Sequence, residues 1–127
     1  MLGKFQQSQL RIELEAPATA IRDSLMRPGQ LEKWIILARF PSGMPEQLYP
    51  GFQFTSKIGV VPIHHQVDVV GSDCVRLLLS QGIDGFHEWY WGEGWVQSRL
   101  EGLTLLPLAF GQTLNLLSLR NFLANQS

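Results

Sequence analysis

The sequence predicts an α+β fold in which a curved antiparallel sheet wraps around a long C-terminal helix. Three observations predict it. Runs of alternating apolar and polar residues, separated by short turns, fill residues 52–106. A strand-like run near the start is followed by two short helical segments. The last twenty residues repeat leucines at helical spacing, and this helix is the only predicted element long enough to cover one face of the sheet.

The N-terminal part predicts one strand and then two short helices. Leu10, Ile12 and Leu14 alternate with charged residues, which is the two-residue period of a half-buried strand. The tripeptide Arg27-Pro28-Gly29 separates the two helices, because proline and glycine disfavour a helix interior. The apolar positions at helical spacing are Ile21 and Leu25 in the first helix, and Leu31, Trp34 and Ile35 in the second.

A loop with three prolines, Pro41 to Pro50, leads into the meander, where three strands have a readable inward face. Turn signals such as Gly71-Ser72-Asp73 separate these strands. The residues expected to face the core are Phe52, Phe54, Ser56 and Ile58, then Ile63, His65, Val67 and Val69, then Val75, Leu77 and Leu79.

The two late strands, Phe86–Trp91 and Trp95–Leu106, do not reveal which face is inside. Both faces of the first are partly apolar: His87, Trp89 and Trp91 against Phe86, Glu88 and Tyr90. In the second strand Arg99 and Glu101 share a face with Trp95, which favours a solvated row of charges. If Arg99 pointed inward, it would instead anchor an anionic group.

The C-terminal helix is predicted to begin around Gly111-Gln112-Thr113, with Thr113 as its N-cap. Leu116, Leu119 and Leu123 are spaced three and four residues apart, as on one face of a helix. Leu114 and Leu117 are also three residues apart and form a neighbouring row. The apolar surface is therefore broad, and we expect the helix to be substantially buried.

Composition bounds the function. The 127 residues suit one domain, residues 1–127, and 45% hydrophobic residues suffice for a core. A net charge of −1 without a basic stripe argues against nucleic-acid binding. No apolar run reaches membrane-spanning length. Because Cys74 is the one cysteine, no intramolecular disulfide is expected, and we expect a cytoplasmic protein. The spacing of its three histidines and Cys74 predicts no metal site, and no cofactor motif occurs.

The order of elements resembles the helix-grip fold of the START/Bet v 1-like superfamily (SRPBCC, polyketide cyclase/dehydrase and lipid-transport-like proteins). The local carriers of the resemblance are Leu31-Glu32-Lys33-Trp34, Pro50-Gly51-Phe52, Glu88-Trp89 and Pro107. That superfamily includes lipid-transfer domains, polyketide cyclase-like proteins and activators of the Hsp90 ATPase. The resemblance implies a cavity for an apolar small molecule between the sheet and the final helix.

His65 is the candidate for chemistry. Neighbouring strand residues point to opposite faces, so His64 and His65 cannot bind one metal ion together. A buried imidazole at position 65 would act as a general base or bind a ligand, although a core histidine paired with a neighbour is the simpler reading. The residues expected to contact a ligand are Trp34, Phe52, Phe54, His65, Val67, Leu77, Leu79, Trp89, Trp91 and Leu117.

Three functions remain open from the sequence. The first is binding or carriage of an apolar molecule that is lipid-, polyketide- or isoprenoid-like. The second is a cyclase, dehydratase or hydrolase, with His65 as base and Arg99 or a tryptophan N–H stabilising negative charge. The third is a protein-interaction module of the chaperone-activator kind, with a vestigial cavity and a contact surface formed by the loop Phe40–Tyr49 and any exposed tryptophan.

Overall fold

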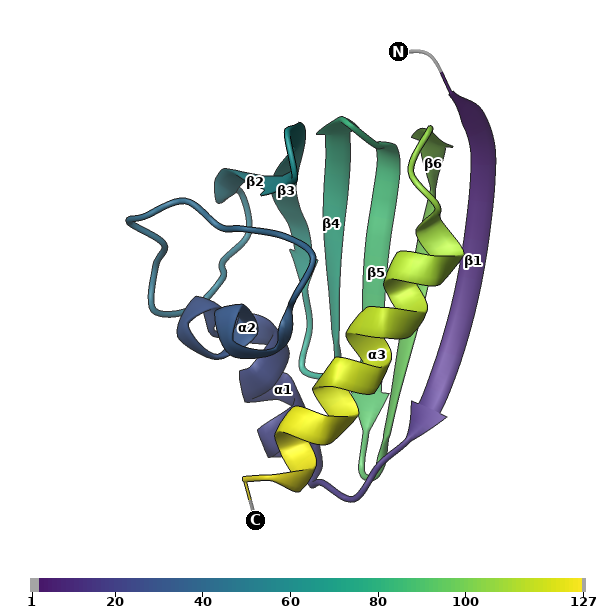
Figure 1. Cartoon of the computed structure of the whole chain (residues 1–127). Coiled ribbons are helices and arrows are strands. Elements are labelled where there is room, and N and C mark those ends of the chain that lie inside the picture. Colours follow the sequence, from purple (N-terminus) through teal and green to yellow (C-terminus); the bar gives the residue numbers. More distant parts are fainter. Residues whose placement is uncertain (1–2, 127) are drawn as a thin grey trace.

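The computed structural model describes residues 3–126, and the predicted helix-grip arrangement is confirmed in it (Figure 1). One six-stranded sheet has the order β1-β6-β5-β4-β3-β2, with every neighbouring pair antiparallel. The elements in chain order are β1 (Lys4–Glu13), α1 (Ala18–Met26), α2 (Pro28–Trp34), β2 (Gln53–Ile58), β3 (Val61–Val70), β4 (Cys74–Gln81), β5 (Asp84–Gly92), β6 (Trp95–Thr104) and α3 (Leu108–Ala124).

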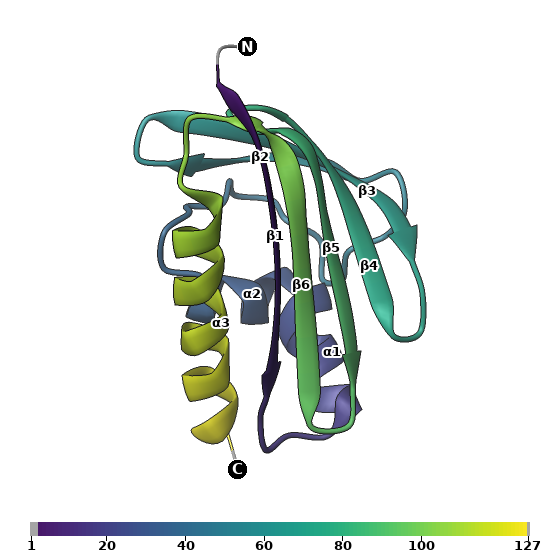
Figure 2. The same cartoon turned by 90° about the vertical axis from the view of Figure 1, so that its right-hand side faces the viewer.

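The helices α1 and α2 carry the chain from one edge strand, β1, to the other, β2. Helix α3 crosses the sheet and packs on β1, β6 and the two short helices, as Figures 1 and 2 show. Within the described residues, no helix is both long and apolar enough to cross a membrane.

The two short helices are held to each other by a buried hydrogen bond. Pro28 occupies the first turn of α2, where its missing N–H costs nothing and its fixed φ suits a helix start. The Trp34 indole Nε1 donates to the Ser24 carbonyl at 2.8 Å. The indole of Trp34 also meets that of Trp89 edge to face, with ring centroids 6.0 Å apart. Trp34 thereby joins α1, α2 and the sheet.

The inward faces predicted for β2 and β4 are confirmed, but the prediction for β3 fails at its end. Ile63 and Val67 are buried, whereas Val69 is 47% exposed. A β-bulge lies between Val67 and Val69, so Asp68 is an extra residue opposite β4 and the alternation reverses beyond it. Val70 takes the inward position instead and packs against the core.

The late strands now have a defined inner face. Trp89 and Trp91 are buried in the core together with Val96 and Leu100. Trp95 lies on the outer face, where the guanidinium carbon of Arg11 sits 4.1 Å from the centre of its ring. Strand β6 ends at Thr104, two residues before the predicted end.

Helix α3 begins earlier than predicted. Its first residue is Leu108, directly after Pro107, and the Thr113 hydroxyl donates to the Ala109 carbonyl from within the helix. Thr113 is therefore not the N-cap. The buried residues are Leu108, Gln112, Leu116, Leu119 and Leu123, so the core-facing stripe is narrower than the apolar surface suggested.

Candidate ligand-binding cavity

A cavity of about 300 Å³ lies between the inner face of the sheet and the three helices. Its walls come from α1, α2, strands β2 to β6, α3, the segments 35–40 and 106–107, and the loop residues Leu48 and Ile83. None of its lining residues is Asp, Glu, Lys or Arg. Its polar side chains are hydroxyls, amides and imidazoles: Ser56, His65, His87, Ser98, Gln112 and Asn115.

His65 is positioned by an aromatic neighbour and a serine on the adjacent strand. Its ring stacks on Phe54 with a centroid distance of 4.5 Å and an interplanar angle of 5°. Its Nε2 lies 2.9 Å from the Ser56 hydroxyl, while its Nδ1 is buried and has no hydrogen-bond partner. Burial, and to a smaller extent the neighbouring His64, lower the pKa of His65 to about 4. The imidazole is therefore neutral at physiological pH.

His87 belongs to a hydrogen-bonded chain that ties α3 to the sheet. Its Nε2 lies 2.8 Å from the Ser98 hydroxyl. Gln112 Nε2 donates to the carbonyls of Ser8 and Ser98 at 3.2 and 3.0 Å, and it lies 3.0 Å from the Ser98 hydroxyl. Its Oε1 accepts from the Ser8 hydroxyl at 2.6 Å. Because carbonyl oxygens only accept, these contacts fix the orientation of the Gln112 amide.

In the contact between His87 Nε2 and the Ser98 hydroxyl, either group donates, according to which ring nitrogen of His87 holds the proton. Burial, followed by the effect of His65, lowers the pKa of His87 to about 3. Both cavity histidines are thus uncharged.

Asn115 enters the cavity wall from α3. It lies three residues after Gln112 and four before Leu119, so it shares their side of the helix. Its Oδ1 is buried and has no hydrogen-bond partner. A buried carbonyl oxygen without a donor is costly in a folded protein.

The cavity reaches the surface near the N-terminal turn of α3. Pro107 and Phe110 line it and are also exposed, Phe110 by 62%. Gly111 lies close to Leu37 here, since a Cβ added to it would be 3.7 Å from a Leu37 methyl group.

The structure gathers five of the ten residues expected to contact a ligand. Phe54, His65, Leu77, Leu79 and Trp89 line the cavity. Trp34, Val67 and Trp91 are buried in the core but do not line it, and half-buried Phe52 packs on Tyr49. Leu117 is 50% exposed because its position on α3 lies away from the buried stripe, so its expected place in the cavity wall is wrong.

Sequence reasoning missed four polar residues of the wall: His87, Ser98, Gln112 and Asn115. The facing of His87 and Ser98 was ambiguous because both faces of their strands carry apolar residues. Gln112 and Asn115 do share a helical stripe with Leu116, Leu119 and Leu123. That stripe was the available signal for them.

Arg99 lies outside the cavity. It is on the outer face of β6, where its guanidinium contacts Glu101 at 2.9 Å and Glu88 at 3.6 Å. The solvated row of charges predicted for this face is present. The alternative, an inward Arg99 that stabilises an anion, is wrong because alternation along β6 turns Ser98 and Leu100 inward.

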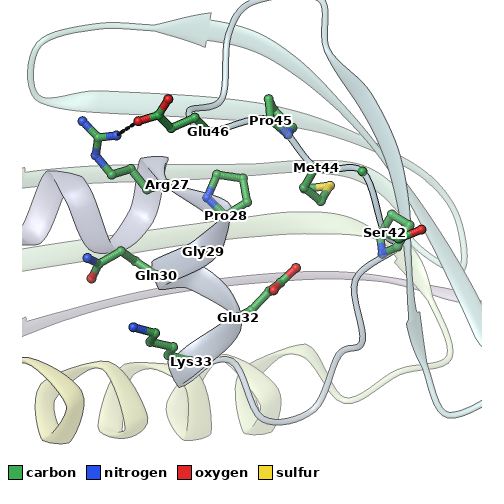
Figure 3. A pocket seen from close by; sticks show the side chains of 12 residues that line it. Arg27, Pro28, Gly29, Gln30, Glu32, Lys33, Ser42, Met44, Pro45 and Glu46 are labelled. Atoms are coloured by element: carbon green, nitrogen blue, oxygen red, sulfur yellow. Dashed lines mark ion pairs between the residues drawn. The ribbon is translucent and has the colours of Figure 1, made fainter.

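A second hollow, of about 600 Å³, lies between α2 and the loop around Met44 (Figure 3). More than half of its wall is exposed, including Glu32, Lys33 and Glu46, and Arg27 reaches across to Glu46 at 3.5 Å. It is a solvent-exposed groove, and none of its lining residues has a buried, unpaired polar side-chain atom. Elsewhere in residues 3–126, no three His, Cys, Asp or Glu side chains gather as metal ligands would.

No family model matches this sequence, and no curated protein matches it either. Solved structures do match. DynU16, from the dynemicin biosynthetic locus, has a TM-score of 0.72 at 14% identity over 95% of this chain, which spans about half (48%) of DynU16. Protein CV1439 from Chromobacterium violaceum has a TM-score of 0.72 at 14% identity, covering 92% of this chain and 96% of that one.

A third match is Aha1 from Colwellia psychrerythraea, solved as a dimer. Its TM-score is 0.66 at 14% identity, and the match covers 93% of this chain and 96% of Aha1. At such identities the likeness establishes the fold and not the activity. The chain has a Bet v 1-like helix-grip fold, as its order of elements predicted.

Proposed function

We propose that the chain binds an uncharged, predominantly apolar small molecule in the cavity between its sheet and α3. The observation that carries this proposal is a cavity of about 300 Å³ with a largely apolar wall and no charged side chain. Small-molecule sites are usually built in this way, with apolar walls and a few placed polar groups.

The volume limits the size of the ligand. Pockets for small molecules run from about 300 to 1,000 Å³, so this one is at the lower end. A compact molecule of two or three fused rings, or a short isoprenoid, suits it better than a lipid with two long chains. Among the ligand classes expected from the resemblance, we therefore favour polyketide-like and short isoprenoid-like molecules.

Binding is better supported than catalysis. A general base works best when its pKa lies near the working pH, and the pKa of His65 is about 4. Arg99, the second catalytic candidate, is on the outer face of the sheet. The protein-interaction module is also less well supported, because we expected such a module to have a vestigial cavity and this cavity has a volume of about 300 Å³. A cytoplasmic location remains a prediction from the lone Cys74.

Fluorescence of N-phenyl-1-naphthylamine, a neutral dye that brightens in apolar surroundings, tests the proposal. We expect saturable binding at a 1:1 ratio to the wild-type protein. Leu79→Phe adds bulk to the cavity wall and should weaken binding at least about tenfold, because the larger side chain takes up part of a cavity of about 300 Å³. Leu78→Phe, one residue along on the outer face of β4, is the matched control. Equal weakening by both changes, or no binding by the wild type, would contradict the proposal.

A further inference from the structure

His87 lies within the part of the cavity wall that the sheet provides. Its partners across β4 and β6 are Leu77 and Leu100, and both of these line the cavity as well. Trp89, two residues further along β5, also lines it, with its ring centroid 4.7 Å from that of His87. His87 is thus flanked on three sides by cavity-lining side chains, yet it is only half-buried. The surface that it keeps therefore faces the cavity.

The two ring nitrogens of His87 are in different situations. Nε2 lies 2.8 Å from the Ser98 hydroxyl. Nδ1 has no hydrogen-bond partner among residues 3–126. Unlike Nδ1 of His65, it is not one of the fully buried side-chain atoms without a partner, so it keeps accessible surface. His87 Nδ1 is therefore an accessible hydrogen-bonding atom in a largely apolar wall.

We infer that the ligand carries a hydroxyl group that forms a hydrogen bond with His87 Nδ1. This inference rests on the proposed binding function and narrows the class of ligand to an uncharged apolar molecule with a hydroxyl group, such as a phenol or an isoprenoid alcohol.

A hydroxyl group fits because it both donates and accepts hydrogen bonds. The ring of His87 is neutral at pH 7, since burial lowers its pKa to about 3, so one of its nitrogens donates and the other accepts. The Ser98 hydroxyl at Nε2 plays either part, so Nδ1 is the donor in one tautomer and the acceptor in the other. A hydroxyl group pairs with both tautomers, whereas an ether oxygen pairs with one.

A purely apolar ligand is disfavoured at the same atom. It would cover His87 Nδ1 and exclude water from it without supplying a partner. A polar atom that is buried without a hydrogen bond is costly. The hydroxyl group would avoid that cost, and the apolar remainder of the ligand would lie against Leu77, Leu100 and Trp89.

Three probes with the same ring system test this contribution: naphthalene, 2-naphthol and 2-methoxynaphthalene. Isothermal titration calorimetry at pH 7, with the protein titrated into each compound, gives the three affinities. We expect 2-naphthol to bind about fivefold more tightly than naphthalene, since its hydrogen bond adds to the apolar contacts. We expect 2-methoxynaphthalene to bind at least about threefold more weakly than 2-naphthol, because its oxygen cannot donate.

A variant assigns the preference to His87. In His87→Phe, we expect the fivefold preference for 2-naphthol over naphthalene to fall to about twofold or less, because the ring nitrogen is gone. His64→Phe is the control and should keep the preference. The same substitution there changes a histidine on the other face of β3, hydrogen-bonded to Thr55 and Gln53.

NMR of the wild-type protein with nitrogen-15-labelled histidine keeps the inference testable should His87→Phe fail to fold. We expect saturating 2-naphthol to shift the Nδ1 resonance of His87 further than naphthalene does, because only 2-naphthol forms a hydrogen bond with this atom. The ring resonances of His64 serve as the internal control. Equal shifts of His87 Nδ1 with both compounds would overturn the inference.

The affinities distinguish the failure of this inference from the failure of the proposed function. Equal binding of naphthalene and 2-naphthol to the wild type would overturn the hydroxyl inference and leave the apolar cavity site intact. A preference that survives in His87→Phe, or 2-methoxynaphthalene that binds as tightly as 2-naphthol, would overturn it as well. Binding of none of the three probes would overturn the proposed function together with the inference.

Discussion

His65 and His87 both line an apolar cavity, and burial lowers the pKa of the first to about 4 and of the second to about 3. An imidazole in the unfolded chain titrates near 6.5. Below that pH the two imidazoles are protonated in the unfolded chain but stay neutral in the folded protein. The stability that these two residues contribute is therefore complete above about pH 6.5 and is lost as the pH falls toward 4 and then 3.

We predict a marked loss of stability between pH 7 and pH 5, a range in which ordinary carboxylates stay largely ionised. Each histidine would contribute up to about 2 kcal/mol of that loss. Urea unfolding at the two pH values measures it. His65→Phe should remove about half of the loss, and a loss unchanged by that substitution would contradict the assignment. His64→Gln, on the opposite face of β3, is the control.

Asn115 gives a second prediction for a single residue. Because its Oδ1 is buried without a donor, Asn115→Leu should stabilise the empty protein by about 1 kcal/mol, which raises the Tm by roughly 3–6 °C. Asn121→Leu makes the same change at an exposed position of α3 and controls for helix propensity. A fall in Tm for Asn115→Leu would contradict this expectation and show that the Asn115 amide stabilises the fold.

At the scale of the element, two glutamines bond α3 to the sheet: Gln112 from the helix, and Gln6 of β1, whose Oε1 accepts from the Leu108 N–H at 3.2 Å. Gln112 bonds to Ser8 on β1 and to Ser98 on β6, and these contacts fix the helix above two strands that the sequence places about ninety residues apart. The leucines Leu116, Leu119 and Leu123 are buried on the same side of α3. The leucine stripe could be read from spacing, but the glutamine contacts depend on the folded arrangement.

Gln112→Leu should therefore cost about 2–3 kcal/mol, because it leaves the Ser8 hydroxyl and two backbone carbonyls short of a partner. Thr113→Ala, the next residue, should change stability by less than about 0.5 kcal/mol, because Thr113 lies inside the helix and alanine is the better helix former. Chemical denaturation of both variants measures this. A cost of about 1 kcal/mol for Thr113→Ala would instead be typical of a lost N-cap.

The limits of sequence reasoning also appear at this scale. Asp68 looks like an ordinary outward residue of an alternating strand, so nothing in the pattern revealed the bulge that turns Val69 outward. In β5 the outer face carries Phe86, whose ring has the Arg76 guanidinium 4.6 Å from its centre. Because both faces of β5 carry aromatic residues, alternation did not predict its inner face. The pairing of β5 with β4 and β6 determines that face.

At the scale of the whole molecule, the order and type of elements were enough to predict the fold, because a meander with one buried face needs the final helix as its cover. The cavity was not predictable in the same way. It depends on where side chains fail to touch, and Trp34, Val67 and Trp91 fill the core while Leu77, Leu79 and Trp89 border open space. Periodicity identifies inward residues but does not separate these two groups.

The most direct test of an internal binding site is an NMR experiment on methyl-labelled protein at saturating N-phenyl-1-naphthylamine. The account predicts intermolecular NOEs from the ring protons of the dye to the methyl groups of Leu77 and Leu79, both on the cavity wall. NOEs to Met44 in the surface groove of Figure 3, with none to those two leucines, would contradict it.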